Sequence, residues 1–190
     1  MIDQSALNTH FREVWNNIEG VPGKVSPRVV DVVTALNSSP NLVIDVGCGH
    51  NQYKGVIPNL VGFDPVEYNS NIDQICTLED AKFDTESADI IMALGSINYG
   101  SFDYILSQYQ KLDTWLKPGG YVVCRANVTP TNQIPHHRRN SQYYSMNENA
   151  IANIATAMNY DILNVNQLVN YKQYDMSTFG PNRKLWVYKK

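Results

Sequence analysis

Hydrophobic residues follow two different spacings along the chain: a helical period before residue 40 and short unbroken runs after it. The first helical pattern ends near Gly20, a residue type that commonly follows helices. Its apolar members are Leu7, Phe11, Val14, Trp15 and Ile18. A second helix is predicted from Ser26-Pro27, because Ser accepts a free backbone N–H at a helix start and Pro fits the first helical position. We expect both helices, within residues 1–40, to form an N-terminal cover.

From residue 42 onward the apolar runs are short and continuous, which is typical of strands buried on both faces of a parallel sheet. Helical stretches separate these runs, the clearest of them over residues 102–116. The alternation predicts an open α/β sheet. Its first five strands are predicted at residues 42–46, 60–64, 72–76, 89–94 and 121–126.

The last third of the chain shows a different pattern. Ser145-Met-Asn-Glu148 has the form of a capping box, in which the Ser and Glu side chains each bind a free backbone N–H, and it predicts a helix through Ile151 and Ile154. Two further strands are predicted at about 161–168 and 184–188, with a long loop over 169–182 between them. With no repeat or linker, we expect residues 1–190 to form a single domain.

Composition narrows the class of protein. The 190 residues are 43% hydrophobic and 17% charged, and no run approaches the ~20 apolar residues of a membrane span. The N-terminal residues lack the pattern of a secretory signal, so a cytoplasmic location is expected. A net charge of −3 excludes a bulk polyanion binder. Three widely spaced cysteines without a CxxC pair predict reduced thiols and no metal site.

Candidate chemistry is concentrated where the first two predicted strands end. Asp45, Gly47 and Gly49 place an acid and a glycine turn directly after the first strand, and glycine allows a ligand to approach the backbone closely. Asp64 ends the second strand and could accept hydrogen bonds from both hydroxyls of a ribose. The alternative for the glycine residues is an ordinary tight turn between a strand and a helix. The alternative for Asp64 is a solvated carboxylate at the end of a strand. Gln52 stands where a dinucleotide fingerprint has its third glycine, which disfavours NAD or FAD.

Four motifs in order resemble the class I S-adenosylmethionine-dependent methyltransferases, over about residues 41–126. They are Asp45-Val-Gly-Cys-Gly49, Gly62-Phe-Asp64-Pro65, Thr85-Glu-Ser-Ala-Asp-Ile-Ile91 and Leu116-Lys-Pro-Gly-Gly120. The resemblance implies a Rossmann-like, doubly wound sheet of seven strands in the order 3-2-1-4-5-7-6, with only the last strand antiparallel. It implies S-adenosylmethionine as the cofactor, bound by residues 41–126, and methyl transfer as the activity.

The resemblance also implies roles for individual residues. The turn Gly47-Cys48-Gly49 would lie against the methionine portion of the cofactor, with Asp45 orienting the turn or reaching the amino group. Asp64 would hold the ribose hydroxyls and Pro65 would flank the adenine. Thr77 stands where the family usually has an acidic residue, so its hydroxyl or the Leu78 backbone would meet the adenine amino group. Leu94 and Ser96 would close over the cofactor, and the first helix, about 52–57, would be short.

A weaker match covers residues 134–145, where His136 or His137 would lie near the substrate and could take a proton from a hydroxyl acceptor. The alternative is a solvated loop that contacts anionic groups. The N-terminal helices and the loop 127–147 would then form the acceptor pocket, next to the helix and terminal hairpin of residues 127–190. A small-molecule acceptor is the first expectation. A nucleic-acid or protein acceptor is the second, because Arg138 and Arg139 adjoin the two histidines.

Two other functions remain open. The chain could be a catalytically silent module or partner subunit that binds S-adenosylmethionine or its demethylated product, since the usual adenine-site acid is missing and no acceptor motif is present. An NAD-dependent oxidoreductase is the weaker alternative.

No Asn-Pro-Pro-Tyr sequence follows the fourth strand, which disfavours methylation of adenine in DNA. The cysteines lack the Pro-Cys setting of a cytosine-methylating nucleophile, so we interpret them as small buried residues.

Overall fold

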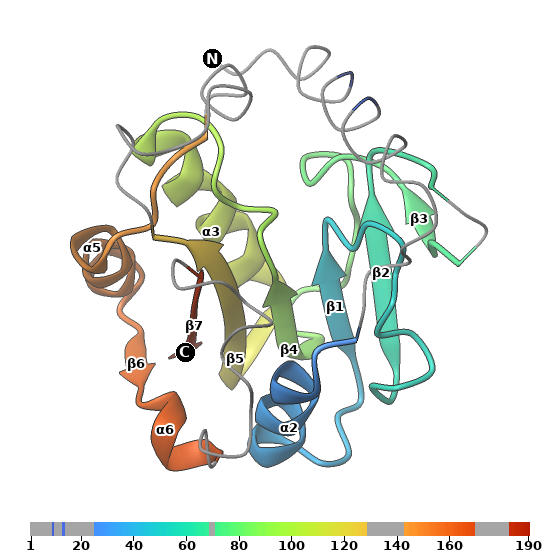
Figure 1. The fold of residues 1–190 in the computed structure, drawn as a ribbon, viewed down its shortest axis with the longest axis horizontal. Coiled ribbons are helices and arrows are strands. Elements are labelled where there is room, and N and C mark those ends of the chain that lie inside the picture. Colours follow the sequence, from blue (N-terminus) through green and yellow to red (C-terminus); the bar gives the residue numbers. More distant parts are fainter. Residues whose placement is uncertain (1–8, 10–12, 14–24, 69–70, 129–142, 170–182) are drawn as a thin grey trace.

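The computed structural model describes residues 9, 13, 25–68, 71–128, 143–169 and 183–190. Within these residues the chain forms a seven-stranded sheet of order β3-β2-β1-β4-β5-β7-β6 (Figure 1). The strands are β1 (Val43–Val46), β2 (Leu60–Asp64), β3 (Gln74–Ile75), β4 (Ala88–Ala93), β5 (Leu116–Asn127), β6 (Asp161–Leu163) and β7 (Arg183–Lys189). The helices are α2 (Pro27–Leu36), α3 (Phe102–Trp115), α5 (Glu148–Met158) and α6 (Val165–Leu168).

Strand directions confirm the predicted topology. β1 pairs in parallel with β2 and β4, β2 pairs in parallel with β3, and β4 pairs in parallel with β5. β7 is antiparallel to both β5 and β6, so among the seven strands that the structure describes it is the only reversed one. The order changes direction at β1, because β2 and β3 lie to one side of it and β4 and β5 to the other. The carboxyl ends of β1 and β4 therefore flank the switch point at which open α/β sheets bind ligands.

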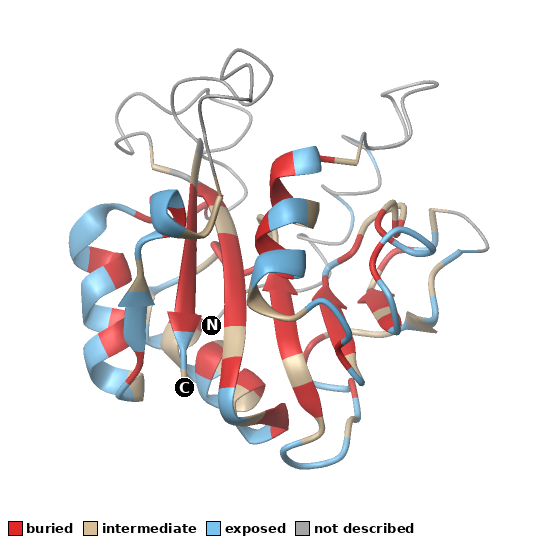
Figure 2. Cartoon of the chain, turned by 90° about the horizontal axis from the view of Figure 1, so that it is seen from below, coloured by how far each residue is buried: buried red, intermediate tan, exposed pale blue. Residues whose placement is uncertain are grey.

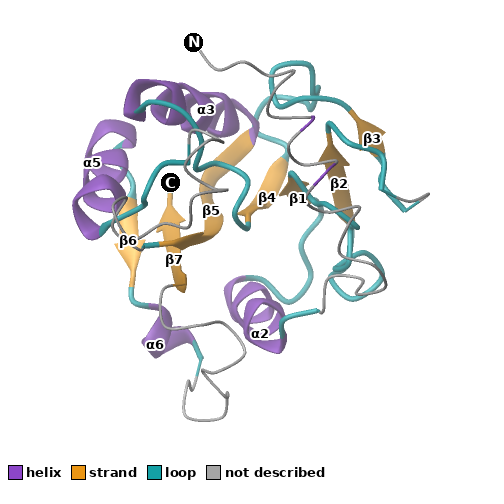
Figure 3. Ribbon diagram, turned by 45° about the horizontal axis from the view of Figure 1, so that its top comes forward, coloured by secondary structure: helices purple, strands orange, loops and turns teal. Residues whose placement is uncertain are grey.

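Helices cover both faces of the sheet (Figure 3). One buried cluster joins Ile44 and Ile91 of the strands to Ile105 of α3 and Ile154 of α5. A second cluster joins neighbouring strand residues such as Val43 to Val29 and Val33 of α2 and to Val165 of α6. Successive strand residues point to opposite faces, and both faces are apolar, so the central strands β1 and β4 are almost wholly buried (Figure 2).

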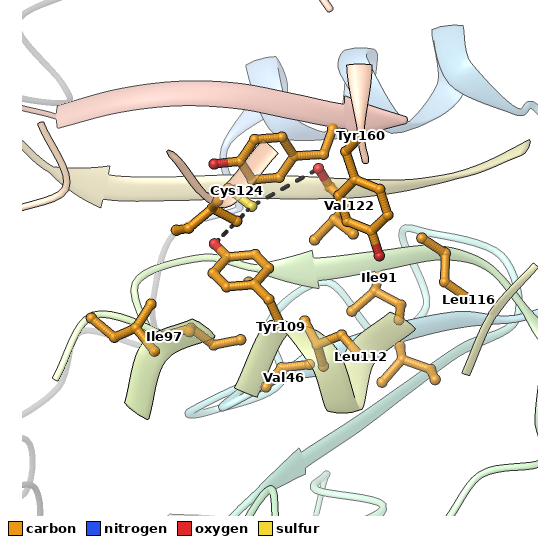
Figure 4. Packing of buried hydrophobic residues seen from close by; sticks show 14 of the residues in the cluster. Val46, Ile91, Ile97, Tyr109, Leu112, Leu116, Val122, Cys124 and Tyr160 are labelled. Carbon is orange, nitrogen blue, oxygen red and sulfur yellow. Dashed lines mark hydrogen bonds between the residues drawn. The ribbon is translucent and has the colours of Figure 1, made fainter. Parts of the chain in front are cut away.

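The α3 face contains an unusual set of buried polar aromatic residues. The Tyr109 hydroxyl lies 3.4 Å from Cys124 Sγ, and that sulfur also contacts the Val122 carbonyl oxygen at 3.9 Å (Figure 4). The Tyr188 hydroxyl donates to the Ile151 carbonyl oxygen at 2.9 Å and so ties β7 to α5. Burial raises the pKa of Cys124 to about 12, which keeps its thiol protonated at neutral pH. Cys124 is therefore the small packing residue that the sequence predicts.

Helix α2 begins as predicted, with Ser26 as the N-cap and Pro27 in the first turn. The Ser26 side chain accepts from the Val29 backbone N–H at 3.4 Å. The first predicted helix lies mostly outside the described residues, although Thr9 and Glu13 are helical. The loop predicted at 169–182 also lies outside them, except for Val169.

Helix α5 starts close to the predicted place, but the predicted capping residue is wrong. The N-cap is Asn147, and its side-chain oxygen accepts from the Ala150 backbone N–H at 2.9 Å. Asn serves as well as Ser in this position, and Ser145 lies two residues too early and is itself buried. Glu148, the other half of the predicted capping box, forms an ion pair with Lys184 of β7 at 2.8 Å.

Replacing Asn147 by Ala should lower the free energy of unfolding by about 1 kcal/mol, because the Ala150 N–H would lose its capping partner. Urea unfolding followed by circular dichroism would measure the loss. Glu148→Gln is the comparison variant, because Glu148 is exposed and outside the observed cap. A larger loss for Glu148→Gln than for Asn147→Ala would contradict the observed capping.

The short helix predicted at 52–57 is absent, and the chain makes a series of turns there. Asn51 has a positive φ of 51° and Gly55 one of 80°, and neither value allows a right-handed helix. The Asn51 side chain lies flat on β2: its Nδ2 atom donates to the Asn71 carbonyl oxygen at 2.8 Å, and a Cβ on Gly62 would lie 2.5 Å from its Oδ1 atom. Side-chain packing against Gly62 thus replaces the helix.

Three predicted strands differ in extent. β3 has only two residues, β5 begins at Leu116 rather than at 121, and the segment predicted as a strand at 161–168 divides into β6 and the short helix α6. The Asn164 side chain accepts from the Asn166 backbone N–H at 3.1 Å and starts that helix. Its capping geometry ends the strand after Leu163, although the apolar pattern continues.

Candidate functional site

The glycine turn after β1 is joined to the end of β2 by two hydrogen bonds. The Cys48 backbone N–H donates to the Phe63 carbonyl oxygen at 3.0 Å, and the Gly49 N–H donates to Asp64 Oδ2 at 2.9 Å. Gly47 and Gly49 both have positive φ values, 62° and 58°. These conformations favour glycine, so the predicted turn chemistry matches the observed backbone. The two strand ends on which the sequence prediction depends therefore lie side by side.

Asp64 is buried at this junction and uses both carboxylate oxygens. Oδ2 accepts from Gly49, and Oδ1 accepts from the Val66 backbone N–H at 2.9 Å. A carboxylate has about four acceptor positions, so about two remain. Burial raises the pKa of Asp64, although the two backbone N–H groups and nearby His50 oppose the shift. The remaining acceptor positions suit a ligand that presents two hydroxyl donors.

Asp45 lies beneath the turn and is only 3% exposed. Burial raises the pKa of Asp45 to about 7, the guanidinium of Arg125 lowers it, and Asp64 raises it further. Arg125 belongs to β5, so this charge reaches the site from beyond β4. The sequence analysis missed Arg125. The available signal was a charged residue inside the otherwise apolar run 121–126.

The loop after β4 packs directly on the glycine turn. A Cβ added to Gly47 would lie 2.5 Å from Ser96 Cβ, so no side chain fits there. Ser96 is half-buried, and its Oγ atom is buried without a hydrogen-bond partner. Leu94 packs against the α2 face of the sheet. The predicted site residues Gly47 and Ser96 are thus in contact, as expected if the loop closes over one ligand.

Cys48 contributes little polar chemistry to the turn. It is 8% exposed, and its sulfur makes only a weak 3.9 Å contact with the Gly49 carbonyl oxygen. Burial raises the pKa of Cys48, with Asp45 and Asp64 adding to the effect. The thiol is therefore protonated at neutral pH and acts as a small packing group. Pro65 follows Asp64 directly and is half-buried.

The two predicted adenine contacts follow β3, at the same edge of the sheet. The Thr77 hydroxyl donates to Asp80 Oδ2 at 2.9 Å and accepts from the Asp80 backbone N–H at 3.3 Å, so its hydrogen bonds are made within its own turn. Leu78 is buried and belongs to the core on the α3 face. The next residue, Glu79, accepts from the Tyr104 hydroxyl at 2.6 Å, which fastens this turn to α3.

An aromatic pair stands next to the loop after β4. Tyr99 and Tyr143 form an isolated antiparallel bridge, and their rings meet edge to face with centroids 5.7 Å apart. The Tyr144 backbone N–H donates to the Asn98 carbonyl oxygen at 2.7 Å. These contacts join Tyr143 and Tyr144 to the loop after β4. His136, His137, Arg138 and Arg139 lie outside the described residues.

Among the residues that the structure describes, no group of three or more His, Cys, Asp and Glu side chains could hold a metal ion. No helix in that part of the chain is both long and apolar enough to cross a membrane.

Known proteins match this chain in structure rather than in sequence. No family model matches the sequence, and no curated protein matches it. The 1,6-didemethyltoxoflavin N1-methyltransferase of Burkholderia thailandensis, solved with bound 1,6-didemethyltoxoflavin and S-adenosylhomocysteine, has a TM-score of 0.67 at 14% identity, over 99% of this chain and 85% of that chain. A possible histamine N-methyltransferase of Thermotoga maritima has a TM-score of 0.59 at 12% identity, over 96% and 99%.

The cyclase SpnF, which is named for a 4+2 reaction, has a TM-score of 0.65 at 13% identity, over 97% of this chain and 94% of that chain. Identities this low establish the fold and not the reaction. The chain has the Rossmann-like fold of the class I S-adenosylmethionine-dependent methyltransferases, with the expected strand order.

Proposed function

We propose that this protein binds S-adenosylmethionine and transfers its methyl group to a small-molecule acceptor, as a single domain. The observation that carries the proposal is Asp64, a buried carboxylate that holds the glycine turn through Gly49 and keeps about two acceptor positions for ribose hydroxyls. Asp64 ends β2 directly beside β1, whose carboxyl end borders the switch point of the sheet, which supports the proposal.

Other features of the turn fit the same cofactor. The backbone at Gly49 is open, because an added Cβ would have no atom within 4 Å, so a ligand can lie against it. Buried Asp45, with its pKa raised to about 7, offers a carboxyl group that an amino group of a ligand would help to ionise, and the Ser96 Oγ atom needs a partner. The Thr77 hydroxyl is occupied by Asp80, which favours the Leu78 backbone as the adenine contact.

The cofactor supplies a methyl group on a reactive sulfonium. The chain's residues therefore need mainly to hold the reactants in line and to exclude water. Asp64 would hold the ribose, the glycine turn would hold the methionine portion, and the loop after β4 would position the acceptor. A small acceptor is favoured because the Burkholderia neighbour is named for one.

The turns at 50–57 disfavour an NAD-dependent oxidoreductase. Dinucleotide pyrophosphates bind at the N-terminus of the helix that follows the glycine turn. This chain has turns there, with Asn51 and Gly55 in left-handed conformations. No helix start is available at that place for a pyrophosphate.

Calorimetric titration and a transfer assay test the proposal. We expect S-adenosylmethionine and S-adenosylhomocysteine to bind in the micromolar range and NAD not to bind. Incorporation of tritiated methyl groups into a broad set of small acceptors would establish transfer. Binding without incorporation into any acceptor would favour the silent module, and no binding of either compound would refute the proposal.

Asp64→Ala should weaken S-adenosylmethionine binding by about 10- to 100-fold, the range for hydrogen bonds to a charged group. Isothermal titration calorimetry would measure the change. Asp84→Ala removes an exposed carboxylate away from the turn and should bind normally. Circular dichroism would confirm that Asp64→Ala folds, and Asp64→Asn, which keeps one acceptor oxygen, should fall between it and the wild type. Equal affinity in all variants would remove Asp64 from the site.

A further inference from the structure

Arg125 is the only charged residue of the segment 120–127, which forms the greater part of β5. Its neighbours Cys124 and Ala126 belong to the core on the α3 face. Side chains alternate along a strand, so Arg125 lies on the opposite face, together with Val123 and the residues that pack against α2. Charged side chains are rare in strands that are covered on both faces, and this one therefore points to a role beyond packing.

The strand register places Arg125 at the carboxyl edge of the sheet. Ala93, the last residue of β4, pairs with Cys124, so Arg125 lies beside the start of the loop that packs on the glycine turn. The two backbones are close, because a Cβ on Gly95 would lie 3.8 Å from the Arg125 carbonyl oxygen. The Arg125 side chain is half-buried and so retains access to solvent at the edge where open α/β sheets bind ligands.

Asp45 and Arg125 form a pair of opposite charges across β4. Both neighbours of Asp45 in β1 belong to the core on the α3 face, so Asp45 shares the α2 face with Arg125. Asp45, Met92 and Val123 lie in one row of the sheet. Arg125 therefore stands two residues nearer the carboxyl edge than Asp45. The guanidinium acts on Asp45 by lowering its pKa against the effect of burial.

We propose that Arg125 is a cofactor-binding residue: its guanidinium holds the carboxylate of the amino acid end of S-adenosylmethionine, while Asp45 takes the amino group of the same end. The inference rests on the proposed function and specifies what the β5 side of the site recognises. An α-amino acid carries one cation and one anion on the same carbon, which matches a site with one anion and one cation. The planar fork of Arg suits a carboxylate, because two parallel N–H groups can donate to its two oxygens.

The spacing of the strands fits a ligand of this size. β4 lies between β1 and β5, and neighbouring strands are about 4.8 Å apart, so β1 and β5 are separated by about 10 Å. The long Arg125 side chain covers much of this distance from the β5 side. An amino acid end that lies against the glycine turn after β1 has only the remainder to reach.

The two charges also predict a selectivity. A ligand that has the amino group but lacks the carboxylate brings a cation toward Arg125 without an anion to offset it, and like charges repel. A ligand without either group neither gains nor loses from the guanidinium. Arg125 therefore selects an intact amino acid end over its decarboxylated form.

Calorimetric titration with three ligands, in the absence of any acceptor, tests the inference. S-adenosylhomocysteine carries both charged groups, decarboxylated S-adenosylhomocysteine keeps only the amino group, and methylthioadenosine carries neither. The proteins are the wild type, Arg125→Gln, Arg125→Lys and Lys184→Met. Lys184→Met is the matched control, because it removes a cation from the neighbouring strand β7 that pairs with Glu148 of α5.

We expect the wild type to bind S-adenosylhomocysteine at least about tenfold more tightly than its decarboxylated form. Arg125→Gln should lower the affinity for S-adenosylhomocysteine by about 10- to 100-fold, the range for hydrogen bonds between charged groups. Its affinity for methylthioadenosine should stay within about twofold, and the decarboxylated ligand should bind as well as before or better. Arg125→Lys keeps the charge without the fork and should fall between. Lys184→Met should bind all three ligands normally.

Three results would overturn the inference and leave the proposed function standing. An equal loss of affinity for all three ligands in Arg125→Gln would give Arg125 a structural role only. Unchanged affinity of this variant for S-adenosylhomocysteine would place the carboxylate elsewhere, and equal binding of both homocysteine ligands by the wild type would show that the site does not recognise a carboxylate. Circular dichroism establishes whether Arg125→Gln folds, and Arg125→Lys replaces it if it does not. Failure of the wild type to bind S-adenosylhomocysteine and S-adenosylmethionine would instead overturn the proposed function itself.

Discussion

Gly47→Val is expected to reduce S-adenosylmethionine binding by more than about 100-fold, a loss of at least ~2.7 kcal/mol. The first carbon of the new side chain would lie 2.5 Å from Ser96 Cβ, and that atom sits next to the backbone and cannot swing away. The φ of 62° is also one that a β-branched residue rarely adopts. The loop after β4 and the glycine turn would have to separate, which changes the surface assigned to the cofactor.

Gly49→Ala is the control for the stability part of this prediction only, because Gly49 itself belongs to the turn assigned to the cofactor. Gly49 has a similar φ of 58°, but no atom lies within 4 Å of an added Cβ. Its Ala variant should therefore show the backbone strain, about 1–2 kcal/mol of stability, without the collision. Calorimetry measures binding, and urea unfolding separates binding from stability. If Gly47→Val is too unstable, Gly47→Ala gives the same collision with less strain. Normal binding by a folded Gly47 variant would mean that the turn does not contact the cofactor.

The core of the fold was predictable because its signals are local and repeated. β1 and β2 are short apolar runs that end at Asp45-Val46 and Asp64, and the observed strands end at Val46 and Asp64. Ser26-Pro27 predicted the start of a helix, and α2 begins there in the structure. The strand order itself came from the resemblance, and the pairings of β1 with β2 and β4 confirm it.

Other features depended on contacts between distant residues and could not be predicted. The turns at 52–57 follow from Asn51 lying on Gly62, a packing that no local pattern reveals. Asn147 and Ser145 are both good caps, and the choice between them depends on burial of the segment before α5. The influence of Arg125 on Asp45 crosses β4 and became visible only when the strands were placed. Features that a local sequence signal specifies were therefore predicted correctly, and features that depend on contacts between distant residues were not.

Loss of stability with rising pH is the second large effect that we expect, and Asp45 is its source. Burial raises the pKa of Asp45 from 3.8 to about 7, so between these values the folded protein holds a proton that the unfolded chain has released. Stability is therefore greatest at low pH within this window and falls as the pH rises through about 7. From pH 5 to pH 8 the loss due to Asp45 is about 2–3 kcal/mol.

Urea unfolding of the wild type and of Asp45→Asn at pH 5 and pH 8 measures this loss. The Asn variant cannot ionise, so its stability should fall less between the two pH values than that of the wild type. Asp73→Asn is a control of opposite sign. Hydrogen bonds from Lys54, Gly62 and Asn51 lower the pKa of Asp73 despite partial burial, so ionised Asp73 stabilises the fold and loses that effect as the pH falls.

The same experiment connects stability to the proposed cofactor. The charged groups that act on Asp45 from neighbouring strands are Arg125 of β5, which favours its ionised form, and Asp64 of β2, which opposes it. An amino group of a bound ligand would add a second cation beside Asp45 and lower its pKa. Saturating S-adenosylmethionine should therefore flatten the pH dependence of the wild type more than that of Asp45→Asn. Equal flattening in both proteins would place the ligand's amino group away from Asp45.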